Sequence, residues 1–320
     1  MVIQPLILLA SLFVIIVAAS LLSVALYVTG SYLIYAYDRR LARSGHLHPP
    51  HDELGELPKG WDRARGLLLE IYATYAIVAL FPFGKIGYRS IQKAAKGRGC
   101  RPILLIHGYN LNRSCWAKFR RALKEAGLGP IYTLNLPRRS GGLPGLACAI
   151  KEEAERIERE TGVKELILIG HSMGGLVSAF YAERLATAGS VSHVITLGSP
   201  LHGTRSAVFT SCIIGRQMHV GSDFVKDLSH AIMINRKVRY HHVASQFDNI
   251  ILPFQSALIG RDLDCELLLS DIGHNSLLFS PRVTSQVVEW LKRSAPAMQQ
   301  EGRSRALPCA LSPTPSQNAK

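Results

Sequence analysis

Hydrophobic residues dominate the start of the chain, where residues 6–37 contain no charged side chain. A helix needs about 20 apolar residues to cross the hydrocarbon core of a bilayer, so this run is long enough. The competing interpretation, a cleaved secretory signal peptide, would have basic residues before an apolar core of about 7 to 15 residues. Residues 1–5 contain no basic side chain, and the run is too long for such a core. The pattern therefore predicts a retained transmembrane anchor over residues 1–37.

A second apolar stretch, residues 66–84, is harder to assign because it contains Glu70 and ends in a Pro-Phe-Gly sequence. It is barely long enough to span a bilayer. Three interpretations stay open: a second span, a helix lying in the membrane interface, or a helix packed on the domain that follows. We favour a membrane-associated helix. Residues 38–65 then form a polar linker, and a basic linker completes the segment 66–99.

From residue 100 onward, short apolar runs alternate with amphipathic stretches of helical length, which predicts alternating strands and helices. Expected strands cover residues 102–108, 130–137, 164–170, 191–200, 238–253 and 265–274. Expected helices cover residues 114–127, 145–162, 173–189 and 280–294. Strands separated in this way form a mostly parallel sheet with helices on both faces. We expect this α/β domain over residues 100–294, followed by a disordered tail rich in Pro, Ser and Gln at 295–320.

Charge bears on the partners and on the orientation in the membrane. The formal net charge is +14, which favours contact with anionic lipid headgroups. A nucleic-acid partner is not expected, because no helix-turn-helix, zinc-finger or RNA-binding signature accompanies the charge. Arg39, Arg40 and Arg43 follow the first apolar run, so with a single span the rest of the chain lies in the cytoplasm. With two spans the flanking basic residues balance, and the orientation is undetermined.

Cysteine and histidine patterns indicate no metal and no cofactor. The six cysteines include no C-x-x-C pair and match no zinc or redox spacing, so they do not identify the compartment. His46, His48 and His51 lie in the polar linker without a completing ligand at the right spacing. We therefore expect no metal and no organic cofactor, and the oligomeric state stays unknown.

The most informative local pattern is Gly170-x-Ser172-x-Gly174, which follows a predicted strand and precedes a predicted helix. A serine held in a tight strand-to-helix turn is exposed for attack, and small residues two positions before and after it avoid a steric clash. The N-terminus of the helix favours developing negative charge. The pattern and its context predict that Ser172 is a nucleophile.

A serine hydroxyl becomes a strong nucleophile only when a base removes its proton. In this arrangement an acid and then a histidine follow along the chain, each in a loop after a later strand. Asp248 and His274 satisfy both the order and the location. The competing residues lie before or within strands, at a helix start, inside the turn, or too near His274: Asp223, Asp262, Asp264, Asp271, His171, His193, His241 and His242. We predict Asp248 as the acid and His274 as the base.

Two backbone N–H groups should stabilise the oxyanion that forms on attack. One is expected from Met173, directly after the serine. The other is expected from the turn after the first strand, where Gly108 lets the chain bend sharply and the N–H of Tyr109 point into the site. Asn110 is the alternative donor.

These segments resemble the bacterial lipases and esterases of the α/β-hydrolase superfamily, particularly the membrane-anchored lipase-like hydrolases of proteobacteria. The resemblance covers residues 100–293 and rests on HGYNLNRSCW, GHSMGG, LGSPLHGT, GRQMHVGSDFVKDL, DNIILP and GHNSLLFSP. In LGSPLHGT the family usually has Thr-Pro-His-His-Gly-Thr. Ser199 and Leu201 alter this stretch and weaken any special role for His202.

The resemblance implies an α/β-hydrolase fold and a catalytic triad of Ser172, Asp248 and His274, with Tyr109 and Met173 as oxyanion donors. We expect a serine hydrolase, a lipase or carboxylesterase, that cleaves carboxylic ester bonds of lipid-like substrates through an acyl-enzyme. The alternatives are an acyl thioesterase or acyltransferase with the same triad and, less favoured, a non-catalytic membrane scaffold.

We expect the protein in the bacterial inner membrane, with membrane lipids and an acyl-ester or lipid substrate as partners. The sequence identifies no specific substrate-binding residues. Residues 203–222 are apolar enough to form an acyl-binding wall or a cap, but ordinary core packing explains them equally well.

Overall fold

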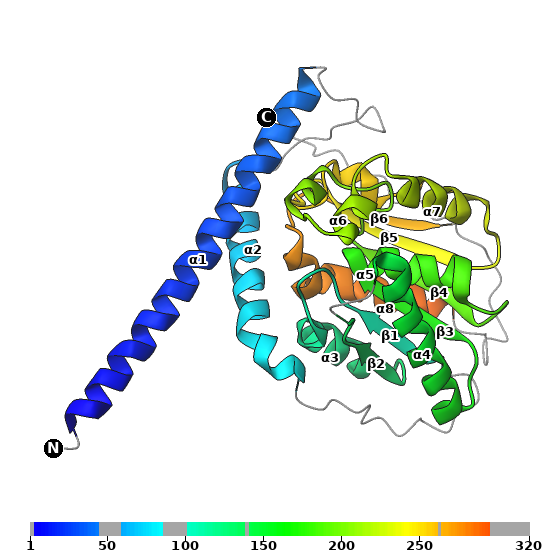
Figure 1. Cartoon of the computed structure of the whole chain (residues 1–320), viewed down its shortest axis with the longest axis horizontal. Helices are drawn as coiled ribbons and strands as arrows, with labels where there is room; N and C mark the ends of the chain where they lie inside the picture. Colours follow the sequence, from blue (N-terminus) through cyan, green and yellow to red (C-terminus); the bar gives the residue numbers. More distant parts are fainter. Residues whose placement is uncertain (1–2, 45–58, 86–100, 138–140, 262–263, 295–320) are drawn as a thin grey trace, which may run out of the picture.

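The computed structural model describes residues 3–44, 59–85, 101–137, 141–261 and 264–294. Figure 1 shows one long helix standing as an arm beside a globular body, with a second helix lying against both. Three parts of the expected organisation lie outside the described residues: the middle of the polar linker (45–58), the basic linker (86–99) and the tail (295–320).

Among the described residues, two helices precede the sheet. They are α1 (Ile3–Arg43) and α2 (Gly60–Leu80), and a 3₁₀ turn, η1 (Phe81–Lys85), continues α2. The segments Val14–Arg43 and Gly60–Lys85 are long and apolar enough to cross a membrane.

Both helices are longer than the apolar pattern predicts, so they occupy the two ends of the linker expected at 38–65. The helix α1 continues past its apolar run because the carboxylate of Asp38 is buried against the body, where it forms an ion pair with Arg205. Burial of Glu70 within α2 likewise shows that this helix packs on protein along one side. Apolar content alone does not reveal where such tertiary contacts extend a helix.

In the part of the chain that the structure describes, six parallel strands form a single sheet in the order β2-β1-β3-β4-β5-β6. Their bounds are β1 Ile103–Ile106, β2 Ile131–Leu134, β3 Leu166–His171, β4 Val191–Leu197, β5 Arg239–Ser245 and β6 Cys265–Leu269. The predicted parallel sheet is confirmed. Strands β5 and β6 are shorter than predicted, so the residues around Asp248 and His274 lie in loops beyond the sheet.

Helices and short turns connect the strands. The helices are α3 Ala117–Glu125, α4 Leu143–Thr161, α5 Met173–Phe180, α6 Ile213–Met218, α7 Asp223–Ile234 and α8 Pro281–Arg293. The turns are η2 Arg113–Trp116, η3 Tyr181–Leu185, η4 Arg205–Phe209, η5 Phe254–Ala257 and η6 Asn275–Phe279. The helix predicted at 173–189 is the one with the largest difference: α5 ends at Phe180, and a wider π-helical turn, η3, follows.

The hydrophobic core has two layers, one on each face of the sheet. Along β1, Leu104 and Ile106 point to the layer shared with α4, α5 and α7, whereas Ile103 and Leu105 point to the layer shared with α3 and α8. Successive strand residues alternate between faces, so both faces of β1 are apolar because both are covered. The predicted helix layers on both faces are confirmed.

The strand order places a topological switch in the middle of the sheet. The chain passes from β1 outward to β2 and then returns to the other side of β1 to form β3. In open parallel sheets, ligands bind beyond the carboxyl ends of the strands at such a switch point. A ligand site is therefore expected beside the segments that follow β1 and β3.

Candidate active site

Ser172 occupies a strained turn between β3 and α5. Its backbone angles are φ 55° and ψ −128°, a conformation that costs a non-glycine residue about 1–3 kcal/mol. Two backbone hydrogen bonds hold the turn: Ser172 N–H donates to the Leu197 carbonyl at 2.9 Å, and the Ser172 carbonyl accepts from Gly175 N–H at 3.0 Å. The turn therefore keeps the serine at the carboxyl end of β3.

The glycines two positions before and after the serine are required by close backbone contacts. A Cβ atom on Gly170 would lie 2.4 Å from the Gly175 nitrogen, and one on Gly174 would lie 2.3 Å from the Ile106 carbonyl oxygen. Both distances are far below van der Waals contact. The helix α5 thus approaches the ends of β1 and β3 so closely that only glycine fits at either position.

Asp248 and His274 come together from the loops after β5 and β6. The His274 Nδ1 lies 2.8 Å from the Asp248 Oδ2. The other carboxylate oxygen of Asp248 accepts hydrogen bonds from Ile250 N–H and Ile251 N–H, both at 2.8 Å. Because an ionised carboxylate only accepts, Nδ1 carries the proton and Nε2 of His274 is left as an acceptor. This is the tautomer that a general base needs.

The environment of His274 changes its proton affinity. Burial disfavours the charged imidazolium, but the charge of Asp248 and its hydrogen bond to Nδ1 favour it, and the charge of Glu70 acts in the same direction. The net result is a pKa of His274 raised above its ordinary value of 6.5. The ion pair with Asp248 therefore makes this histidine a stronger base than one exposed to water.

Ser172 and His274 line the same cavity, which has a volume of about 810 Å³. Within the part of the chain that the structure describes, no hydrogen bond joins the Ser172 hydroxyl to the His274 imidazole. Hydrogen bonds between catalytic groups are often long before the substrate binds and tighten in the complex. Ser172 and His274 thus face one cavity, and Asp248 already orients the imidazole of His274.

The two predicted oxyanion donors flank Ser172. Met173 begins α5, so its N–H is one of those at the helix N-terminus that have no partner inside the helix. The turn after β1 reaches the serine through Gly108, where a Cβ atom would lie 2.9 Å from the Ser172 Cβ. Tyr109 and Asn110 line the cavity beside it. The donor roles of these backbone groups stay a prediction.

A buried histidine orients the turn that carries Tyr109. The Nε2 of His107 accepts a hydrogen bond from Leu136 N–H at 3.0 Å, so its Nδ1 donates to the Gly108 carbonyl at 2.9 Å. Burial lowers the pKa of His107 to about 4, which keeps the ring neutral. The carbonyl and N–H of one trans peptide point in opposite directions, so the Tyr109 N–H points away from His107.

The competing acids and histidines have other partners. Asp271 pairs with Arg282 and Arg65, and Asp264 pairs with Arg261. His171 donates from Nε2 to the His274 carbonyl at 3.1 Å. This hydrogen bond holds the loop that carries His274 and occupies the ring nitrogen that would otherwise act as a base. Four others also lie elsewhere. His193 stacks on His241, which stacks on Trp290, whereas His242 contacts Thr196 and Asp223 begins α7. Asp262 lies outside the described residues.

Sequence reasoning missed Glu70, whose fully buried carboxylate holds the histidine loop. It accepts hydrogen bonds from Asn275 N–H at 2.8 Å, Ser276 N–H at 2.9 Å and the Ser276 hydroxyl at 2.7 Å. It therefore fixes the two residues that follow His274. An ionisable residue inside an otherwise apolar helix is a candidate functional residue. The position of Glu70 in the apolar stretch 66–84 is therefore the sequence feature that could have identified it.

Asn249 is the second missed residue. Its side-chain oxygen accepts a hydrogen bond from His274 N–H at 3.2 Å, and its nitrogen donates to the Ser31 hydroxyl of α1 at 2.6 Å. It thus connects the acid loop, the histidine loop and the N-terminal helix.

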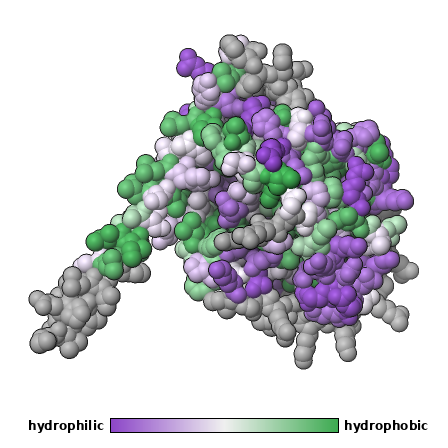
Figure 2. Space-filling view, in the orientation of Figure 1, coloured by the Kyte–Doolittle hydropathy of each residue, from purple (hydrophilic) through white to green (hydrophobic). Residues whose placement is uncertain are grey.

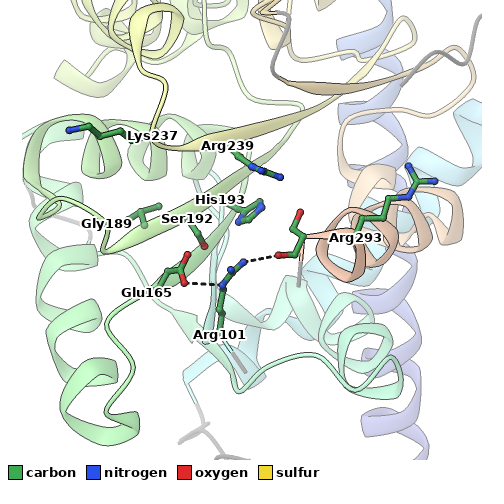
Figure 3. A pocket seen from close by; sticks show the side chains of 10 residues that line it. Arg101, Glu165, Gly189, Ser192, His193, Lys237, Arg239 and Arg293 are labelled. Carbon is green, nitrogen blue, oxygen red and sulfur yellow. Dashed lines mark hydrogen bonds and ion pairs between the residues drawn. The ribbon is translucent and has the colours of Figure 1, made fainter. Parts of the chain in front are cut away.

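A second cavity of about 390 Å³ lies at the opposite, amino ends of the strands (Figure 3). Figure 3 shows Arg101 held between Glu165 and a backbone carbonyl, and this carbonyl belongs to Ser294. The His193 imidazole at this cavity has a pKa lowered to about 4, chiefly by burial and also by the nearby arginines. None of the proposed triad lines this cavity. Among the described residues, no cluster of three His, Cys, Asp or Glu side chains gathers as a metal site requires.

Comparison with known proteins supports the same fold. The mature form of the lipase BlEst2 from Bacillus licheniformis is 17% identical, with a TM-score of 0.52, and the match covers 61% of this chain and 93% of that chain. Lipase B from Aspergillus fumigatus is 18% identical, with a TM-score of 0.53, and the match covers 78% of this chain and 64% of that chain. At these identities the similarity establishes the fold alone.

A model of the alpha/beta hydrolase family matches residues 103–308. The matched region contains all six strands and all five residues predicted for the site. The resemblance found in the sequence motifs is therefore confirmed: the chain belongs to the alpha/beta hydrolase family.

Proposed function

We propose that the protein is a membrane-anchored serine hydrolase that cleaves carboxylic ester bonds of lipid-like substrates. One observation carries the proposal: the strained Ser172 faces the same apolar cavity as His274, which is already oriented by a buried Asp248. An isolated serine turn would support no such assignment, because the hydroxyl needs a base within reach.

The geometry supports a two-step reaction. His274 Nε2 takes the proton of Ser172 as the hydroxyl oxygen attacks the ester carbonyl, and Asp248 stabilises the resulting imidazolium. The N–H groups of Met173 and Tyr109 stabilise the oxyanion. His274 then gives the proton to the leaving alcohol, and an acyl-enzyme remains. Water, activated by the same histidine, attacks the acyl-enzyme and releases the carboxylic acid.

The lining of the cavity supports an acyl group as the part of the substrate that binds there. Most of the lining is apolar, and the segment between β4 and α7 contributes Ala207, Phe209 and Met218. This favours the acyl-wall interpretation of residues 203–222 over simple core packing. Pockets of this kind bind ligands by burying apolar surface and use few polar groups for orientation.

The first test is labelling of the full-length protein by a fluorophosphonate probe. The wild-type protein should be labelled, and Ser172→Ala should abolish labelling, because only an activated serine reacts rapidly with such probes. Ser192→Ala is the matched control, since Ser192 lies at the second cavity and should not matter. A wild-type protein that resists the probe would point to a non-catalytic scaffold, and labelling that survives in Ser172→Ala would point to another nucleophile.

The class of acyl donor needs a second measurement. Hydrolysis of p-nitrophenyl esters, acyl-CoA thioesters and phospholipids by the untreated wild-type protein should favour the oxygen esters. Preference for thioesters, or transfer of the acyl group to an alcohol acceptor, would move the assignment to a thioesterase or acyltransferase.

The pH dependence of kcat/KM should report His274. A protonated imidazole cannot accept the serine proton, so activity falls as the pH falls through the pKa of His274. Because that pKa is raised, we expect the midpoint of the acid limb above 6.5. The measurement is the initial rate on a soluble ester across the pH range at subsaturating substrate. A midpoint below the ordinary histidine value would contradict the proposed Asp248–His274 pair.

A further inference from the structure

The helix α1 consists of two parts with different surroundings. From residue 11 to residue 23 the described side chains are exposed or nearly so, whereas Val24, Val28, Ser31 and Tyr35 are buried. These four residues follow each other at intervals of three or four and therefore lie on one face of the helix. Figure 1 shows the first part as an arm that leaves the body, and Figure 2 shows hydrophobic side chains along it.

The second part of α1 is bound to the loop that carries Asp248. The Tyr35 hydroxyl donates to the Gln246 carbonyl at 2.5 Å, and the Tyr32 hydroxyl donates to the Phe247 carbonyl at 3.2 Å. The Tyr32 ring also packs on the Phe247 ring, with centroids 4.6 Å apart. The helix is therefore a fixed part of the catalytic body along this stretch.

The same stretch of α1 forms a wall of the catalytic cavity. The cavity that contains Ser172 is lined on one side by α1 between Leu26 and Ile34, and on another by the end of α2 from Thr74 to Val78. Gly30 lies in the middle of the α1 wall. A Cβ atom added there would meet no other atom within 4 Å, so a side chain at this position would extend into open space.

The length of the arm places this wall relative to the bilayer. Residues 3–23 form a helix about 31 Å long at 1.5 Å per residue, which matches the roughly 30 Å of bilayer hydrocarbon. Leu26 and Tyr27, the first cavity-lining residues of α1, follow within one turn. With residues 3–23 in the hydrocarbon, the cavity would begin at the level of the lipid ester groups, where tyrosine side chains are enriched.

Exposed apolar side chains of the catalytic body also lie beside this cavity. Val208 and Phe209 of η4 are 67% and 69% exposed, and Phe209 also lines the cavity. Arg205 of the same turn pairs with Asp38 of α1, so the turn itself is attached to this helix. Large exposed hydrophobic residues beside a membrane helix are suited to contact lipid.

We propose that α1 is part of the acyl-binding site as well as the anchor, and that the substrate is a long-chain acyl ester of the bilayer that holds α1. The acyl chain passes from the membrane between α1 and α2 and lies along Gly30, while the ester carbonyl reaches Ser172. This inference rests on the proposed hydrolase function and adds the substrate class and the route of entry.

The first test fills the cavity from α1. In the full-length protein in detergent micelles, Gly30→Leu should lower the ratio of kcat/KM for p-nitrophenyl palmitate to that for p-nitrophenyl butyrate at least about 10-fold, because the added side chain occupies the path of the long chain. Thr29→Leu is the matched control: it adds the same side chain at the next position, which is exposed and does not line the cavity. It should leave the ratio unchanged.

Fluorophosphonate labelling of Ser172 separates the two hypotheses. If the Gly30→Leu protein is labelled and its ratio equals that of the wild type, the α1 wall does not bind the acyl chain and this inference is wrong, while the hydrolase assignment stands. If the wild-type protein itself is not labelled, the hydrolase assignment fails.

The second test examines the route of entry. The protein is reconstituted into phosphatidylcholine vesicles, and a fluorogenic dipalmitoyl glycerol ester is placed either in those vesicles or in separate vesicles without protein. Ester in the vesicles that contain the protein should be hydrolysed at least about 10-fold faster, because the anchor holds the cavity at one bilayer surface. Equal rates would overturn entry from the host bilayer.

Discussion

Replacing His274 with alanine should lower kcat on a soluble ester by about 10⁴-fold to 10⁶-fold. The other described histidine that lines the cavity, His171, cannot replace it, because it donates its Nε2 proton to the His274 carbonyl and is fully buried. Burial lowers the pKa of His171 well below the usual value, with the charge of His274 acting in the same direction. Its ring is therefore held neutral in a structural hydrogen bond.

The fold should survive the change at His274. The loop is also held by backbone and neighbouring contacts that alanine retains, namely His274 N–H to Asn249 and the two N–H groups bound by Glu70. The measurement is kcat from initial rates, with circular dichroism to check folding. The control is His230→Ala, which removes an exposed histidine of α7. Near-normal turnover in the His274→Ala protein would remove this residue from the base role.

The turn at Ser172 could be predicted because its causes are local. A buried strand, a serine between two glycines and a helix start all lie within a few residues, and the close contacts of Gly170 and Gly174 explain why small residues are needed. The parallel sheet was predictable for the same reason, since each strand is an apolar run of its own. Chain order along that sheet was enough to select Asp248 and His274.

The role of the N-terminal helices could not be predicted from the same pattern. An apolar side chain packs equally well against lipid and against protein, so hydropathy does not distinguish a free span from the wall of a cavity. Glu70 contacts Asn275 and Ser276 at a separation of more than 200 residues in sequence. Nothing near Glu70 in the chain identifies that partner, and three-dimensional packing alone brings the two together.

The boundaries of α1 illustrate the same limit. The charged residues after its apolar run predict the start of a linker, yet Asp38 continues the helix because Arg205 neutralises it at the surface of the catalytic body. A local pattern records which residues are polar, but the partner that makes a polar residue compatible with burial lies far along the chain.

Replacing Asp248 with asparagine should lower kcat by about 10⁴-fold, even though the two side chains have nearly the same shape. The asparagine amide can donate to Nδ1 of His274, which would then be the acceptor. The proton would lie on Nε2, the nitrogen that must accept the serine proton. The loss therefore arises from the wrong tautomer and from the loss of the charge that stabilises the imidazolium.

The residual activity of Asp248→Asn should also have a different pH profile. Asp248 is the main cause that raises the pKa of His274, so its removal should shift the midpoint of the acid limb to lower pH. Asp271→Asn is the control, because Asp271 lies in the same loop as His274 but pairs with Arg282 near the surface. A simple structural role for Asp248 would lower the amount of folded protein without moving that midpoint. If Asp271→Asn moved it instead, the acid of the triad would be Asp271, and the short contact between Asp248 and His274 would have no catalytic meaning.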